Sequence, residues 1–140
     1  MSKFEREYLN EKRNGIGKDY WSNGKLEFEG EYINGKKNGK GKLYNNDSLI
    51  FEGEFLYGFK MEGKLYLNNK LEYEGEFLFN KKYNGKGYDE NGNITYELIN
   101  GNGKVKEYDY GGKLQFEGKF LNGKRNGEGK GYDYEGRLKF

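Results

Sequence analysis

The sequence predicts an all-β fold, a shallow and extended array of about six antiparallel β-hairpins. Three observations support this prediction. One line of sequence recurs every 20 to 24 residues, alternating residues within each line mark short strands, and Asn- and Gly-rich turn signals separate those strands. A chain built in this way forms a repeat protein rather than a two-layer globular domain.

One line of sequence recurs along the whole chain. Aligned on its opening aromatic residue, it divides the chain into repeats 4–27, 28–50, 51–72, 73–95, 96–115 and 116–139, and Phe140 opens a seventh line. Because this period leaves no long stretch unassigned, we expect residues 1–140 to form a single array. The C-terminal edge of the array is then open, to be covered by another molecule or by further repeats.

Each repeat has the pattern of one hairpin. In the second repeat, Phe28, Gly30 and Tyr32 alternate with two glutamates, which places the two sets on opposite faces of a strand. The turn signal Asn34-Gly35 follows, and residues 39–42 alternate again as Gly-Lys-Gly-Lys. A second turn signal closes the repeat, so each repeat supplies two strands and two turns.

Pairing of the two strands is chemically consistent. Glu29 and Glu31 then lie across from Lys40 and Lys42 on a solvated face, where each pair contributes a few tenths of a kcal/mol. The glycines of both strands fall on the opposite face and leave room there for aromatic rings. Most of the charge is therefore expected to form a salt-bridged outer face.

The composition fits a thin core. Hydrophobic residues make up 33% of the chain and aromatic residues 18%, with 14 Tyr, 10 Phe and 24 Gly. Large flat side chains spaced by glycine can cover a thin sheet even where aliphatic residues are scarce.

Several function classes are excluded or not expected. The chain has no Cys and no His, which removes the usual zinc ligands and Cys- or His-based catalysis, and no cofactor or metal is expected. Its 25 basic and 23 acidic residues are interspersed, so direct nucleic-acid binding is not expected. No convergent acid, base or nucleophile is found, so we expect no enzymatic activity. Without a signal-peptide pattern, a cytoplasmic location is the simplest expectation.

The lines FEGEYINGKKNGKGKLY, YEGEFLFNKKYNGKGY and FEGKFLNGKRNGEGKGY resemble MORN repeats, the membrane occupation and recognition nexus motif. The stretches NGKLEFEGEY and GGKLQFEGKF also resemble a bacterial variant of that repeat that is linked with antitoxins. The resemblance implies an elongated, twisted, open-ended single-sheet solenoid of hairpins with an aromatic-lined groove. It further implies a module that holds protein partners or, in some relatives, phospholipid.

The fifth repeat departs from the pattern. It reads YELINGNGKVKEYDYGGKLQ, lacks the Glu-Gly and second aromatic of the first strand, and is about three residues short. This departure predicts a bend or a break around residues 96–102, although a tolerated deletion would leave the same trace.

The hairpin turns of the third and fourth repeats are apolar where other turns are basic. The candidate partner-binding residues are Tyr57, Phe59, Met61, Phe79 and Tyr83. Successive turns line up along one edge of an array, so these residues are expected to form an apolar strip. The alternative is that they fold back over the thin core.

The sequence thus predicts a non-catalytic protein-binding module that uses an aromatic-lined groove and the central apolar turns. One alternative is a small inhibitor, of antitoxin, immunity or anti-defence type, that blocks a toxin, nuclease or defence enzyme. Another is binding of an anionic membrane surface through the basic turn residues Lys36, Lys37, Lys124 and Arg125. Self-association through open edge strands is a further alternative.

Overall fold

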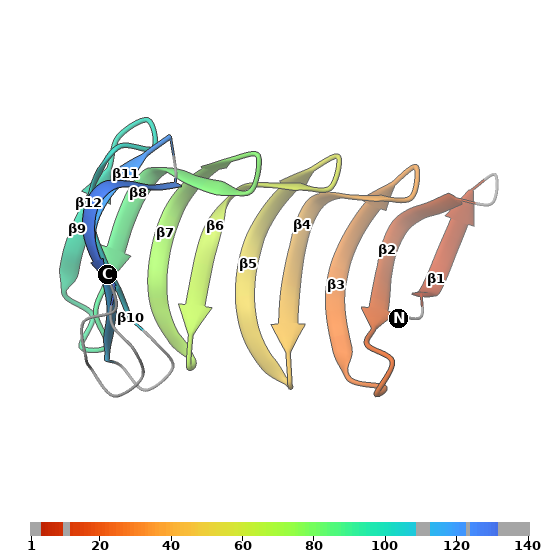
Figure 1. The fold of residues 1–140 in the computed structure, drawn as a ribbon. Coiled ribbons are helices and arrows are strands. Elements are labelled where there is room, and N and C mark those ends of the chain that lie inside the picture. The colour runs from red at the N-terminus through yellow and green to blue at the C-terminus, as the bar shows by residue number, and fades with distance from the viewer. Residues whose placement is uncertain (1–3, 10–11, 109–112, 123, 132–140) are drawn as a thin grey trace. The chain divides into compact units, whose positions relative to one another are not determined.

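The computed structural model describes residues 4–9, 12–108, 113–122 and 124–131, and every regular element in these ranges is a β-strand. The strands are β1 (Phe4–Leu9), β2 (Lys12–Tyr20), β3 (Leu26–Ile33), β4 (Lys36–Asn45), β5 (Ser48–Leu56), β6 (Phe59–Leu67), β7 (Lys70–Leu78), β8 (Lys81–Tyr88), β9 (Ile94–Leu98), β10 (Gly103–Tyr108), β11 (Leu114–Leu121) and β12 (Lys124–Gly131). The predicted all-β fold of antiparallel hairpins is confirmed. Within each hydrogen-bonded sheet the strands are neighbours in chain order, as Figure 1 shows for β1 to β5.

The chain divides into two compact units, residues 1–63 and residues 64–140. In the first unit, β1 to β5 are consecutive antiparallel neighbours. The register repeats from strand to strand, because Gly17 pairs with Gly30 and Gly41 pairs with both Gly30 and Gly53. A row of glycines therefore crosses the strands of this unit.

The second unit contains a discontinuity in strand pairing. Strand β9 is the last member of the nine-stranded sheet, whereas β10, β11 and β12 form a separate three-stranded sheet. Between β9 and β10, the described residues show only the isolated bridge between Ile99 and Asn102. Pairing is thus divided within residues 96–102, the segment in which the sequence predicts a bend or a break. The division falls in the short fifth repeat, whose deletion leaves five- and six-residue strands there.

Tight turns connect the strands, and they use left-handed backbone conformations. Asn34 and Gly35 have φ angles of 50° and 81°, and Asn46 and Asp47 have φ angles of 49° and 67°. Two consecutive positive φ angles characterise the type I′ turn, whose twist matches that of paired strands. Asn, Asp and Gly adopt this conformation at the lowest cost.

The core is a layer of aromatic rings on one face of each unit, which we call the aromatic face. In the first unit it is made by Phe28, Tyr32, Phe51 and Phe55, each at most 5% exposed. The Phe55 ring stands edge-on to the rings of Phe28 and Phe51, with centroids 5.4 Å apart in both pairs. Such edge-to-face contacts stabilise aromatic pairs beyond the burial of their area.

Glycine makes this layer possible. A Cβ atom built on Gly41 would lie 2.5 Å from two ring carbons of Phe28 and 3.2 Å from the ring of Phe55. The ring therefore rests directly on the backbone of the sheet, in space that any other residue would occupy. This contact explains why the glycines recur at fixed places in the repeat.

The opposite surface, the charged face, carries the Glu and Lys side chains of the alternating strands. Glu29 lies across from Lys42 as predicted, and it also forms an ion pair of 3.9 Å with Lys18 on β2. Glu31 does not lie directly opposite Lys40, because a register shift follows Gly30. Its carboxylate instead accepts a hydrogen bond of 2.6 Å from the backbone N–H of Lys40.

We expect the substitution Gly41→Ala to destabilise the protein by about 1–3 kcal/mol, since the added methyl group overlaps the Phe28 ring. Urea denaturation measures this loss. The exposed neighbour Lys42, changed to Ala, provides the control and should alter the free energy of unfolding by less than about 0.5 kcal/mol. A Gly41→Ala protein as stable as the control would contradict the packing described here.

Burial raises the pKa of Tyr73 to about 12. The unfolded chain loses this proton near pH 10, whereas the folded chain holds it, so stability is fully present below pH 10 and declines as the pH rises towards 12. We expect Tyr73→Phe to reduce this alkaline loss of stability, because the variant has no proton there to release. Urea denaturation of both proteins between pH 9 and 11.5 checks it, and equal slopes would contradict it.

Candidate partner-binding surfaces

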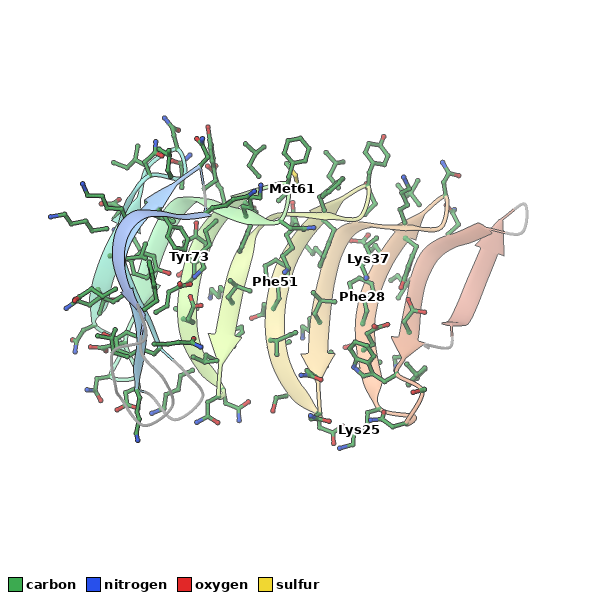
Figure 2. The ribbon with its side chains drawn as sticks, viewed as in Figure 1. Lys25, Phe28, Lys37, Phe51, Met61 and Tyr73 are labelled. Carbon is green, nitrogen blue, oxygen red and sulfur yellow. The ribbon has the colours of Figure 1, made fainter. Side chains whose placement is uncertain are left out.

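An apolar patch lies on the charged face of the first unit, at the edge formed by the hairpin turns. We call it the edge patch, and it consists of Ile33, Leu56, Tyr57, Phe59 and Met61. Each of these side chains is at least 42% exposed. Ile33 and Leu56 end strands β3 and β5, while Phe59 and Met61 are alternate residues at the start of β6. Figure 2 shows Met61 close to this edge.

The three residues of the first unit that the sequence singled out lie in this patch. Tyr57, Phe59 and Met61 are exposed and do not fold back over the core. The sequence prediction omitted Ile33 and Leu56. A signal for them was present, since the residue after the second aromatic of the strand falls on the solvated face and is nevertheless apolar in other repeats, as at Leu78 and Leu121.

The two other predicted residues belong to the second unit. Phe79 follows β7 and is 68% exposed, whereas Tyr83 on β8 is half-buried. Leu78 lies beside Phe79 in sequence and is also exposed. The five predicted residues thus form one set in each unit, and their common strip remains a prediction.

Tyr57 and Phe79 have an unusual backbone conformation. Their φ angles are 47° and 50°, in the left-handed region that Asn34, Asn100 and Asn122 adopt in other repeats. A bulky residue pays a steric cost there that Asn largely avoids. Residues that retain such strain tend to occur at functional sites, so the two exposed rings are contact candidates on conformational grounds as well.

Asparagine side chains connect each hairpin turn to the next in much of the chain. The amide oxygen of Asn38 accepts a hydrogen bond of 3.0 Å from the backbone N–H of Tyr57, one repeat further on. Asn84 accepts in the same way from Asn100 at 2.7 Å. Met61 occupies the corresponding position of the third repeat and has no amide oxygen. At this position an exposed apolar side chain replaces the amide group that accepts the hydrogen bond in the other two repeats.

The aromatic face offers little ring surface to a partner. Its rings are buried, although the resemblance implied that they would line a groove. Lysine side chains from the second strand of the second, third and fourth hairpins lie over them. The ammonium group of Lys37 is 4.9 Å from the centroid of Phe28, and that of Lys60 is 5.3 Å from the centroid of Phe51. The rings are core, and lysines form the accessible layer above them.

The corresponding lysine of the fourth repeat is neutralised. Lys82 bonds the Glu72 carboxylate at 3.0 Å, donates to the Tyr96 hydroxyl at 2.9 Å and lies 3.6 Å from the Glu107 carboxylate. Its side chain is only 11% exposed, which requires this degree of compensation for the buried charge. The cluster joins β7, β8, β9 and β10 within the second unit.

The basic turn residues are not equivalent. Lys36 and Lys124 are exposed, whereas Lys37 is half-buried over Phe28 on the aromatic face. The side chain of Arg125 lies outside the described residues. Lys36 lies opposite Ile33 and therefore projects from the charged face.

Within the described residues, no group of His, Cys, Asp and Glu side chains is arranged to hold a metal ion. The same residues contain no helix that is long and apolar enough to cross a membrane.

A family model for the MORN repeat matches residues 28–48 and 116–130. The first segment contains most of β3, all of β4 and the next turn, and the second contains most of β11 and β12. This match supports a MORN repeat protein, a class whose repeats are generally protein- or membrane-binding modules and typically non-catalytic. A search of curated proteins found no match.

We expect Tyr57→Asn to stabilise the protein by about 0.5–1 kcal/mol, since Asn tolerates the positive φ angle and the backbone hydrogen bond to Asn38 is retained. Urea denaturation measures the gain. Leu56→Asn is the matched control, because Leu56 is an exposed neighbour outside the positive-φ positions and its replacement relieves no strain. Equal effects of the two substitutions would argue against strain at Tyr57.

Proposed function

We propose that this protein is a non-catalytic protein-binding module and that the edge patch is its principal contact surface. The observation that carries this proposal is the exposure of Leu56, Phe59 and Met61, each 42%, on a face whose other side chains are mostly Glu and Lys. An apolar cluster with a polar rim is the usual anatomy of a protein interface, in which a few large side chains dominate the binding energy.

The strain at the turn supports the same proposal. Tyr57 keeps a conformation that Asn would adopt more easily, and its ring is 60% exposed, so folding gains little from it. Phe79 combines the same two properties in the second unit. We propose Phe79 and Tyr83 as further contact residues.

An inhibitor is a narrower form of this proposal. A chain that binds by surface contact could block a toxin, nuclease or defence enzyme in the cytoplasm by covering its working surface. The edge patch would serve that purpose without any added chemistry, and identification of the partner separates an inhibitor from a scaffold.

Anionic phospholipid is the second candidate ligand, because Lys36 and Lys124 are exposed at hairpin turns. The orientation of Lys37 towards the aromatic face removes one of the four predicted lysine and arginine contacts from the turn edge. Binding of this kind predicts sedimentation with phosphatidylserine vesicles at low salt that is lost at high salt.

The test compares affinity purification by the wild-type chain with that by a triple variant, Phe59→Lys, Met61→Asn and Phe79→Asn. Circular dichroism first establishes that both proteins fold. We expect the variant to lose a partner that the wild type retains, and the purified partner to bind the variant at least tenfold more weakly. A Lys42→Ala, Glu54→Ala variant on the charged face is the control and should bind within about twofold. Equal binding by all three proteins would refute the edge patch as the contact surface.

A further inference from the structure

The second unit has a cavity of about 380 Å³ that opens on its charged face, and we call it the basic cavity. It is lined by residues of β9, β10 and β11, and so includes the place at which strand pairing is interrupted. Its polar lining consists of Thr95, Lys104, Lys106, Glu117 and Lys119. Three basic groups and one acidic group therefore surround it.

The first unit contains a matching cavity of about 360 Å³, in which the charges are paired. Lys40 on β4 lies opposite Glu54 on β5, and Lys42 lies opposite Glu52. Glu29 on β3 also lines this cavity and lies opposite Lys42 on the other side. Each lysine of this cavity thus has an acidic residue as its register partner.

The same register recurs around the basic cavity, with one charge reversed. Lys106 lies opposite Glu117, and their side chains form an ion pair of 3.7 Å. At the position of the other opposite-charge pair, Lys104 lies opposite Lys119. Two like charges therefore face each other across β10 and β11.

Lys119 is a departure from the repeat. The same position of the strand is a glutamate in the second, third and fourth repeats, as at Glu54. On β12 the register partner of Lys119 is Asn126, and neither Lys104 nor Lys119 forms an ion pair with another described residue. Like charges placed directly opposite destabilise a sheet, and functional sites are where such a violation of a stabilising pattern is expected.

The two lysines are placed so that they can share one anion. Register partners of antiparallel strands have Cβ atoms about 5 Å apart, and the flexible stems of two lysines can bring both ammonium groups to one point between them. Lys104 and Lys119 are both exposed, so their ammonium groups are accessible. A bound anion would offset the repulsion between them.

Thr95 supplies a further polar group to the same cavity. Its hydroxyl oxygen is buried and has no hydrogen-bond partner in the part of the chain that the structure describes. A buried hydroxyl without a partner costs free energy, and rotation about χ1 can turn it towards a ligand in the cavity. An anion there would accept the missing hydrogen bond.

We propose that Lys104 and Lys119 bind a carboxylate side chain of an extended segment in a partner protein. This inference rests on the proposed protein-binding function and adds a second contact of defined chemistry. Leu121 alternates with Lys119 on β11 and is 47% exposed, so an apolar contact lies beside the lysines on the same face. An extended segment presents every second side chain to one face, so it can place an acidic residue on the lysines and an apolar residue on Leu121.

Two features favour this ligand over a phosphate group or a membrane. Glu117 also lines the cavity, and it repels a doubly charged phosphate more strongly than a singly charged carboxylate. The cavity is a hollow between strands, which a side chain can enter. A flat membrane surface would meet exposed turn residues such as Lys124 first.

The test measures binding of an end-blocked peptide to the full chain by isothermal titration calorimetry at low salt. The peptide is Thr-Glu-Thr-Leu-Thr-Glu-Thr-Leu, in which acidic and apolar residues are two positions apart and threonine favours an extended backbone. A second peptide with Gln in place of Glu is the control for charge. We expect the wild type to bind the Glu peptide and to bind the Gln peptide about tenfold or more weakly.

Lys119→Glu restores the charge pattern of the first unit. We expect it to weaken binding of the Glu peptide about tenfold or more, because Lys104 gains a competing carboxylate. Its free energy of unfolding, measured by urea denaturation, should not fall, since a like-charge pair becomes an opposite-charge pair. Lys36→Glu makes the same change of net charge at an exposed turn of the first unit and should leave peptide affinity within about twofold.

Thr95→Val removes the hydroxyl group and nearly preserves the shape of the side chain. We expect the free energy of unfolding not to fall, because no hydrogen bond is lost, and peptide affinity to fall about threefold. An unchanged affinity would contradict the part that Thr95 has in the site.

Several results would overturn the proposal. They are no heat of binding with the wild type at millimolar peptide, equal binding of the Gln peptide, and an equal loss with Lys36→Glu, which would indicate non-specific attraction. Binding of inorganic phosphate or phosphatidylserine vesicles that depends on Lys104 and Lys119, without binding of the peptide, would overturn it as well. None of these results bears on the edge patch, because affinity purification with the Phe59, Met61 and Phe79 variant tests that surface separately.

Discussion

The contact between an aromatic ring and the bare backbone of a glycine is the constraint on which the rest of this structure depends. Phe28 lies so close to Gly41 that a methyl group has no room between them. Because ring and backbone touch, one layer of side chains is enough to exclude water from the face of the sheet. Phe28 and Phe51 are fully buried, although the described residues of the first unit form a single sheet and no helix. Regular spacing of the glycines then fixes the strand register and, with it, the spacing of the rings and turns along the array.

This constraint also determines which side chains remain accessible for contact with another molecule. Rings used as core are lost as contact surface, so lysines such as Lys37 become the accessible groups on the aromatic face. On the charged face, Glu and Lys side chains largely compensate one another, as the ion pair between Lys18 and Glu29 illustrates. Departures from the repeat are therefore our candidates for binding residues, and Met61 is one such departure within the first unit.

Much of the fold could be predicted from the sequence because it depends on residues that are close together in the chain. Alternation around Gly30, the Asn34-Gly35 turn and the repeat length each specify strands and turns through short-range rules. The sequence left two alternatives open for Tyr57, Phe59 and Met61, exposure at the edge or packing back over the core, because a turn residue can adopt either orientation. The burial of the rings and the orientation of Lys37 towards them depend on contacts between strands, which the sequence does not show directly. Where one sheet ends at β9 and the next begins at β10 depends on how the structure accommodates the shortened repeat.

The hydrogen bonds between neighbouring turns have an evolutionary consequence. The Asn38 side chain accepts a hydrogen bond from the backbone N–H of residue 57, and Asn84 accepts one from residue 100. Because the donor is a backbone group, the bond does not depend on the side chain at either turn. Tyrosine at one turn and asparagine at the other are held in the same way. The side chains at positions 57 and 100 can therefore change, proline excepted, without loss of this hydrogen bond, and the positive φ angle is what limits the choice of residue there. A scaffold of this kind can acquire new recognition specificity one turn at a time.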